Sequence, residues 1–297
     1  MVKVSANARS GATYASWSLG AMTVVWGATF VLVQDVVSVI PVSSFLWWRF
    51  SIAALVMVLL RPRSVLQMTW VDRRRGGIAG LLLGGGYALQ TWGLQHTAAS
   101  VSGFVTGMFV VFTPIMTGLL FRVRIPRNVW AGVVIAAVGL GVLSLHGASM
   151  GAGELVTLVA ALSFSMQIAV LGHWSRAGIA YGLTVVQVSV AAIIGLALTA
   201  FDGGPALPPD AGTWLAIVFL GVVASALAYG VQTWAQVHIS SSRAAVIMTS
   251  EPVWAGITGV AIAGDPLTGR LLVGGGLILL AMYVVELSPH RGPLTSV

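Results

Sequence analysis

The amino-acid sequence consists mainly of long apolar runs that are separated by short polar gaps. A helix that crosses the hydrocarbon core of a bilayer needs about 20 mostly apolar residues, and ten runs approach that length. They cover, to within a few residues, positions 17–39, 44–60, 77–95, 98–121, 128–146, 152–174, 181–200, 212–236, 241–262 and 269–287. The longest gap, the basic segment from Arg61 to Arg75, is too short for a soluble domain. We therefore expect an all-α polytopic membrane protein with ten transmembrane helices.

The composition is typical of a chain whose surface faces lipid. Only 8% of the 297 residues are charged, whereas a soluble domain carries about 25%. The net charge of +7 does not indicate a nucleic-acid partner, because the basic residues lie in the short gaps between apolar runs, where they set orientation. The expected partners are the lipid bilayer and a small-molecule substrate, with no nucleic acid.

The sequence carries no signature of catalysis or of a cofactor. The absence of cysteine excludes disulfides, thiolate metal sites and thiol catalysis. No Walker-type phosphate loop is present, so neither ATP-driven work by this chain nor an ATPase subunit is implied. Nothing resembles a nucleophile elbow, a metal-ligand cluster or a paired-carboxylate site. We therefore expect no metal, no cofactor and no enzymatic activity.

The distribution of basic residues predicts the orientation in the membrane. With the N-terminus placed in the cytoplasm, all of the 15 lysines and arginines lie in cytoplasmic segments except Arg270, which lies outside, and Arg49, which lies within a helix. This positive-inside bias would degrade if one helix were missed or invented. We expect a multi-pass protein of the bacterial inner membrane with both termini in the cytoplasm.

An internal duplication divides the chain into two halves. The segment Tyr87–Trp92 recurs as Tyr229–Trp234 with Tyr, Gln, Thr and Trp matched at an offset of 142 positions, and His96 and His238 match at the same offset. We expect a first repeat at 1–147 and a second at 148–297. Since each half has an odd number of spans, the repeats enter the membrane in opposite senses. Inverted repeats around a central cavity are typical of secondary transporters that work by alternating access.

The duplicated stripes supply candidate cavity residues. Tyr87, Gln90 and Thr91 share one helical face, and amides that faced lipid would have no partners. Lining of a wet cavity and simple interhelical hydrogen bonding both account for such stripes. Aromatic side chains well inside the helices could form a box for an apolar or cationic ligand, or pack. The full candidate set is Trp26, Thr29, Arg49, Tyr87, Gln90, Thr91, Phe104, Thr106, Phe109, Phe164, Gln167, Tyr229, Gln232, Thr233, Thr249, Glu251 and Trp254.

Two charges within the apolar runs need an explanation. A charge at the bilayer centre costs about 2.5–3.5 kcal/mol on insertion scales, so Glu251 should face protein or water. Arg49 lies near the outer end of its apolar run and is shallow enough to snorkel. An offset of 138 positions pairs Arg49 with Gln187 and Trp26 with Phe164 in the second half. The functional interpretation is a proton site at Glu251 and a carboxylate anchor at Arg49. The alternative is a structural ion pair or a helix-packing role for each.

The chain resembles the two-repeat EamA-type branch of the drug/metabolite transporter superfamily. The resemblance is carried, from about Trp17 to Leu287, by Trp26-Gly27, Pro41, Arg49, the stretch Gly93–Ser100, Ser241–Ala245 leading to Glu251-Pro252, and Asp265–Thr268. One departure is Arg122-Val123-Arg124, where an acidic turn is common.

The resemblance implies export of amino acids, other metabolites or drugs, and the aromatic amino acid exporters are the nearest members. Multidrug or cationic compounds and nucleotide sugars stay open as other substrates of the same fold. A channel is the alternative from another class.

Overall fold

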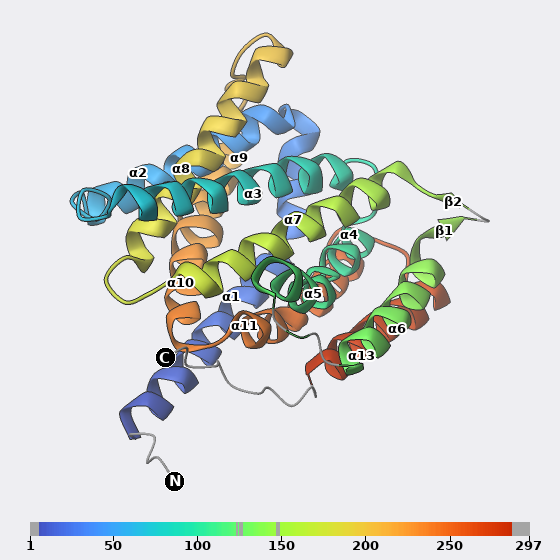
Figure 1. Cartoon of the computed structure of the whole chain (residues 1–297). Coiled ribbons are helices and arrows are strands. Elements are labelled where there is room, and N and C mark those ends of the chain that lie inside the picture. The colour runs from blue at the N-terminus through green and yellow to red at the C-terminus, as the bar shows by residue number, and fades with distance from the viewer. Residues whose placement is uncertain (1–5, 123, 125–126, 147–148, 287–297) are drawn as a thin grey trace.

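The computed structural model describes residues 6–122, 124, 127–146 and 149–286. Its described part is almost entirely helical (Figure 1). The helices of the first half are α1 (Ala6–Val39), α2 (Val42–Leu60), α3 (Trp70–Leu94), α4 (Ala99–Thr106), α5 (Phe109–Phe121) and α6 (Arg127–Ser144). Those of the second half are α7 (Ala152–Trp174), α8 (Ala180–Thr199), α9 (Ala211–Gly221), α10 (Ala228–His238), α11 (Ser241–Ile247), α12 (Glu251–Ala261) and α13 (Gly269–Glu286). Two short strands, β1 (Leu145–His146) and β2 (Ser149–Met150), pair between α6 and α7.

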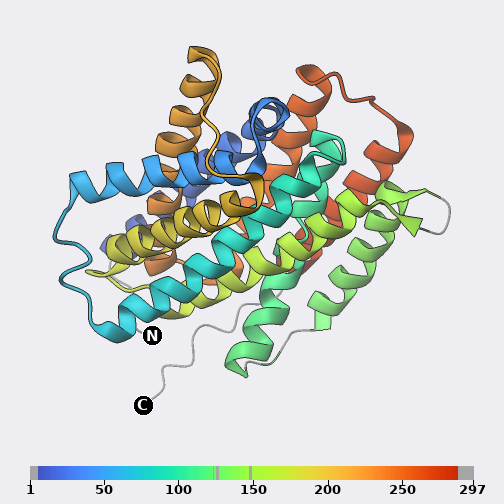
Figure 2. The same ribbon diagram turned by 90° about the horizontal axis from the view of Figure 1, so that it is seen from above.

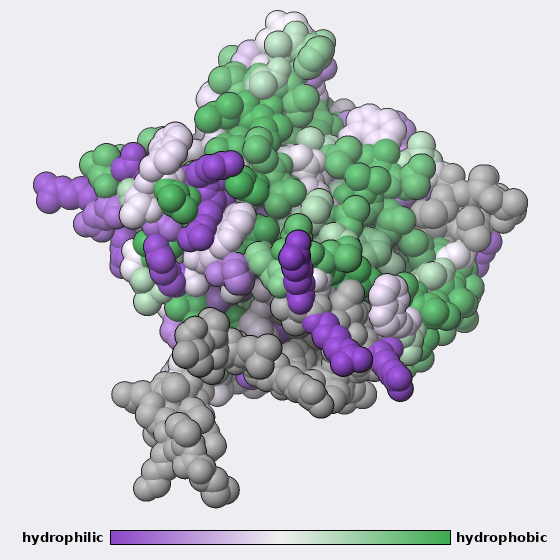
Figure 3. Space-filling view, in the orientation of Figure 1, coloured by the Kyte–Doolittle hydropathy of each residue, from purple (hydrophilic) through white to green (hydrophobic). Residues whose placement is uncertain are grey.

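Several helices are long and apolar enough to cross a membrane. Within the described residues, six meet that criterion: Gly11–Val39, Val42–Leu60, Ala99–Phe121, Ala152–Trp174, Ala180–Asp202 and Ala211–His238. Trp130–Leu143 and Gly269–Val284 are shorter apolar helices. The outer face seen in Figure 3 is hydrophobic over much of its area. Because helices satisfy all backbone hydrogen bonds internally, this is a multi-pass membrane protein built almost entirely of helices.

The third helix begins earlier than its apolar run. The prediction of a start near position 77 was wrong, since α3 begins at Trp70. Thr69 provides the reason: its hydroxyl accepts a hydrogen bond from the backbone N–H of Asp72 at 3.2 Å, an N-cap that stabilises the first turn. The segment Arg73–Arg75, expected in a loop, therefore lies in the first turns of a helix.

Three of the predicted helices are interrupted. The run at 98–121 divides into α4 and α5, which meet around Gly107 and Met108. A π-helical turn, Val222–Leu227, joins α9 to α10. A 3₁₀ turn, Met248–Ser250, joins α11 to α12, so Glu251 starts a helix instead of lying within one. Such irregular turns in membrane proteins occur where backbone lies against protein or a cavity.

Helix pairs approach closely where glycine faces the neighbouring helix. α3 packs against α7 and α8, and α6 packs along α13, a pair that runs side by side in both Figure 1 and Figure 2. A Cβ at Gly84 would lie 2.9 Å from Cα of Ala191, and one at Gly274 would lie 2.8 Å from the backbone nitrogen of Leu143. The absent side chains thus let backbones touch, as expected for glycine at helix contacts in lipid.

Candidate functional site

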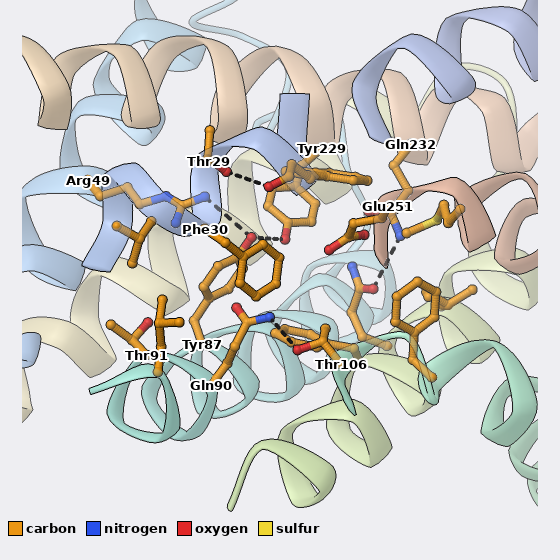
Figure 4. Close-up of a pocket in the computed structure, with 18 residues that line it drawn as sticks. Thr29, Phe30, Arg49, Tyr87, Gln90, Thr91, Thr106, Tyr229, Gln232 and Glu251 are labelled. Atoms are coloured by element: carbon orange, nitrogen blue, oxygen red, sulfur yellow. Dashed lines mark hydrogen bonds between the residues drawn. The ribbon is translucent and has the colours of Figure 1, made fainter. Parts of the chain in front are cut away.

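A pocket lies between helices of both halves (Figure 4). Its free volume is about 50 Å³, which is room for a few water molecules. Of the predicted site residues, it is lined by Trp26, Thr29, Arg49, Tyr87, Gln90, Thr91, Thr106, Phe109, Phe164, Gln167, Tyr229, Gln232 and Glu251. Side chains from eight helices, drawn from both halves of the chain, therefore converge on one small space.

Five further lining residues complete the pocket: Phe30, Val33, Leu94, Ile168 and Met248. Phe30 and Val33 follow Trp26 by four and seven positions, and Ile168 follows Phe164 by four, so a helical face drawn through the predicted aromatics contains them. Phe30, Val33 and Ile168 were not among the predicted residues, because the prediction rested on polar and aromatic stripes and did not extend the same helical faces to all of their apolar residues.

Two tyrosines meet at the centre of the pocket. The hydroxyl of Tyr229 on α10 donates to the hydroxyl of Tyr87 on α3 at 2.7 Å. Their ring centroids are 6.2 Å apart with the planes at 83°, an edge-to-face arrangement that aromatic rings favour. Trp26 lies 5.3 Å from Tyr229, and Phe164 lies 5.3 Å from Tyr87. The aromatic residues thus form one connected wall, with hydroxyls at its middle.

Arg49 on α2 is buried and points into the protein. Its side chain does not snorkel: the residue is only 2% exposed. The Nε atom donates to Oγ of Ser225 at 2.8 Å, and Nη2 donates to the hydroxyl of Tyr87 at 3.3 Å. The guanidinium carbon lies 4.6 Å from the Tyr87 ring centroid and 5.4 Å from that of Phe50, distances at which aromatic faces attract a cation.

The acceptor of Arg49 is held in place by the π-helical turn. Ser225 lies in that turn, and its hydroxyl donates to the carbonyl of Leu220, five residues back, at 2.9 Å. The lone pairs of the same oxygen are then free to accept from Arg49. No carboxylate of the described residues lies within 4.0 Å of Arg49, since the ion pairs found there are Arg75–Asp72 and Arg176–Asp72.

Glu251 is the buried acid of the pocket. It is 7% exposed and stands in the first turn of α12, where the helix dipole favours a negative charge. Within the described part of the chain its carboxylate has neither a hydrogen-bond nor an ion-pair partner. A structural ion pair was one interpretation of Arg49 and Glu251 in the sequence, and these two residues do not form one with each other in this conformation.

The amides both line the pocket and join helices. Gln90 donates to the hydroxyl of Thr106 at 3.1 Å. Gln232 donates to Gln167 at 3.3 Å, and Gln167 donates to Gln187 at 2.9 Å. The buried Oε1 of Gln232 has no hydrogen-bond partner among the described residues. The two interpretations of these stripes, cavity lining and interhelical bonding, thus apply to the same side chains.

Some predicted site residues lie elsewhere. Phe104 is buried, but a Cβ at Gly256 or Gly275 would lie within 3.1 Å of its ring, so it fills the contact of α4 with α12 and α13. Thr233 accepts a hydrogen bond from Gln187 away from the lining. Trp254 is 37% exposed on the outer side of α12. None of these three lines the pocket, and the side chain of Thr249 lies outside the described residues.

A comparison with known protein families identifies the family of this chain. The model of the EamA-like transporter family matches residues 14–145 and again residues 151–287. The chain belongs to this family. A protein named "Uncharacterized transporter", from Archaeoglobus fulgidus, is 30% identical over 92% of this chain and 86% of its own length.

One further relative and one solved structure extend the comparison of this EamA-family chain. A Salmonella typhimurium protein named "Probable amino-acid metabolite efflux pump" is 24% identical over 89% of this chain and 91% of its own. A solved crystal structure aligns with a TM-score of 0.68 at 20% identity, covering 92% of this chain and 98% of its own. The structural match shows that the fold is shared.

Proposed function

We propose that this EamA-family transporter crosses the membrane ten times, as two inverted repeats of five helices at 1–147 and 148–297. The first repeat then contains one interrupted span, α4–α5, and the second contains two, α9–α10 and α11–α12. The double match of the family model supports this division. So does the geometry at equivalent positions: Nδ1 of His96 contacts the carbonyl of Trp92 at 2.8 Å, and Nδ1 of His238 contacts that of Trp234 at 3.0 Å.

The tyrosine pair supports a location for the axis that relates the two halves. Tyr87 and Tyr229 occupy equivalent positions, 142 residues apart, and they hydrogen-bond to each other. A residue can touch its own counterpart only when both lie close to the axis. The pocket around them therefore corresponds to the place where inverted-repeat transporters hold their substrate, near the midplane between the repeats.

The proposed activity is export of small metabolites, amino acids including aromatic ones among them, by alternating access across the bacterial inner membrane. Both termini lie in the cytoplasm in this proposal, in keeping with the positive-inside bias of the gaps. The observation that carries it is the pocket itself, where both halves supply aromatic walls, amides and two buried charges to one small space. The name of the Salmonella typhimurium relative supports the substrate class.

The size of the pocket supports a mechanism with moving parts. Pockets for drug-sized ligands measure about 300–1,000 Å³, and this one offers about 50 Å³. A substrate of that size therefore fits only after helices of the two halves separate, as alternating access requires. This favours a carrier over the channel alternative. Aromatic walls beside Glu251 make cationic compounds the second candidate substrate class.

Efflux from liposomes tests the proposal. Vesicles containing the purified protein are loaded with a labelled mixture of amino acids, including aromatic ones. Saturable efflux that excess unlabelled phenylalanine suppresses, and that falls in Gln90→Ala and Gln232→Ala, is the expected result. Gln95→Ala is the matched control, because Gln95 donates to the carbonyl of Val37 at 2.9 Å outside this pocket. Efflux no faster than from protein-free vesicles, with and without a pH gradient, would contradict this substrate class.

A further inference from the structure

The central pocket contains two opposite charges that have no charged partner. Arg49 comes from the first half and Glu251 from the second, and both are buried, at 2% and 7% exposure. They are not paired with each other or with another charge among the described residues. In Figure 4 they lie on opposite sides of Tyr87 and Tyr229, both directed toward the same space.

The equivalent positions in the two halves do not repeat these charges. At the offset of 138 that relates Trp26 to Phe164, Arg49 corresponds to Gln187. Beyond the segment with the offset of 142, the offset returns to 138, where Pro114 matches Pro252 and Glu251 corresponds to Thr113. Gln187 bonds to Gln167 and Thr233, and the hydroxyl of Thr113 bonds to the carbonyl of Phe109. The neutral residues at the equivalent positions thus form hydrogen bonds within the fold. Each charge is present in one half only, the cation Arg49 in the first and the anion Glu251 in the second.

Each end of the pocket also retains unused hydrogen-bonding capacity of the matching kind. Beside Arg49, the hydroxyl of Tyr87 accepts from both Arg49 and Tyr229, which leaves its own proton to donate. Beside Glu251, the buried Oε1 of Gln232 lacks a donor. One end therefore offers donors to an anion, and the other offers acceptors to a cation.

An unpaired buried charge is unfavourable, so a ligand gains most by pairing both. A neutral ligand leaves both charges unpaired, and a ligand with one charge leaves the other. Only a ligand with a carboxylate and an ammonium group satisfies Arg49 and Glu251 together. Building on the proposed function, we propose that Arg49 and Glu251 select zwitterions, with Arg49 and Tyr87 binding the carboxylate and Glu251 and Gln232 binding the ammonium group.

The first test uses ligand analogues on the unaltered protein. The full chain is purified in detergent, and the rise in its thermal unfolding temperature, which reports ligand binding, is titrated. The ligands are phenylalanine, 2-phenylethylamine and 3-phenylpropanoate, with leucine and its two analogues as a second series. Loss of one charge-assisted contact should weaken binding on the order of ten- to a hundredfold, so each zwitterion should bind more tightly than both of its single-charge analogues.

The second test reverses each preference separately. In Glu251→Gln, 3-phenylpropanoate should bind as tightly as phenylalanine while 2-phenylethylamine stays weak, and Arg49→Gln should show the opposite pattern. Glu154→Gln is the matched control, since Glu154 is also 7% exposed but accepts from the hydroxyl of Thr97 at 3.0 Å outside the pocket. Arg243→Gln, at an exposed position, is the control for the arginine.

The outcomes separate this inference from the export proposal. Zwitterion preference in binding without efflux from liposomes would support the charge assignment and contradict export. Efflux of amino acids by a protein that binds the single-charge analogues equally well would overturn the charge assignment alone. If neither zwitterion raises the unfolding temperature, or if 2-phenylethylamine raises it more than phenylalanine does, the assignment is also overturned. The measurements on the unaltered protein decide these cases even where Arg49→Gln does not fold.

Discussion

The hydroxyl groups of Tyr87 and Tyr229, which match in the duplicated sequence at an offset of 142 positions, are 2.7 Å apart. This bond joins α3 to α10, and it is continued by Arg49, which donates to the same Tyr87 oxygen, and by Ser225, which accepts from Arg49. The pocket is therefore organised by a chain of hydrogen bonds that crosses from one half to the other. Breaking individual links of this chain has distinguishable consequences.

Tyr87→Phe should be more damaging than Tyr229→Phe. Removal of the Tyr229 hydroxyl deletes one hydrogen bond, a loss of about 1 kcal/mol in the free energy of unfolding. Removal of the Tyr87 hydroxyl leaves both Arg49 and Tyr229 without an acceptor, a cost of about 1–3 kcal/mol for each buried donor. Thermal unfolding in detergent measures the difference. Tyr181→Phe is the control, because its hydroxyl bonds to the carbonyl of Met57 away from the pocket. Equal effects of the two central variants would contradict the bonding order.

Ser225→Ala should weaken substrate binding without touching the pocket lining. Ser225 does not line the pocket, but it accepts from Nε of Arg49. Its loss leaves that donor unpaired, at about 1–3 kcal/mol, and allows the guanidinium to move. We expect the apparent KM for efflux to rise several-fold. Ser189→Ala, which deletes a hydroxyl bonded to the carbonyl of Val185, should leave the KM unchanged, and the same rise in both variants would argue against positioning.

Adjacent glycines of α3 should respond to alanine with opposite signs. A Cβ at Gly84 would lie 2.9 Å from Cα of Ala191 on α8, whereas a Cβ at Gly85 would meet no atom within 4 Å. Gly84→Ala should therefore destabilise the protein by about 1–3 kcal/mol through overpacking. Gly85→Ala should stabilise it by about 0.5–1 kcal/mol through helix propensity. An unfolding temperature that Gly84→Ala raises as much as Gly85→Ala does would contradict the close contact of α3 with α8.

Asp72→Asn should loosen the start of α3 in a salt-dependent way. Asp72 is buried at 1% exposure, and both of its carboxylate oxygens lie 3.0 Å from Nη2 of Arg176. We expect a loss of about 1–2 kcal/mol in unfolding free energy. Because the Arg176 side chain is 60% exposed, the loss should shrink at high ionic strength. Asp35→Asn, at an exposed position, is the control, and a loss that ignores salt would point to the Thr69 cap instead of the ion pair.

The polar part of the candidate site was predictable from the amino-acid order. Amides and charges within apolar runs have no partners in lipid, so they must turn toward protein or water. Gln90, Gln232, Arg49 and Glu251 accordingly all line the pocket. The repeat of Tyr, Gln, Thr and Trp identified the two helices that meet at the tyrosines, because it is a property of spacing alone.

The apolar part was not predictable in the same way. Lipid tails are as apolar as leucine, so an aromatic or aliphatic side chain gives no local indication of which face of its helix points inward. Phe104 and Trp254 were expected in the cavity, yet one packs between helices and the other is partly exposed. Phe30 and Val33 line the pocket, although nothing in their chemistry requires it.

Helix existence, the duplication and the need to bury Arg49 and Glu251 follow from residue type and spacing, since hydrocarbon tolerates few other arrangements. Helix rotation follows from packing: the close contact at Gly84, the π-helical turn that presents Ser225, and the 3₁₀ turn before Glu251. These depend on neighbours remote in the sequence, which is why the folded chain alone reveals that the two charges face one pocket and remain apart.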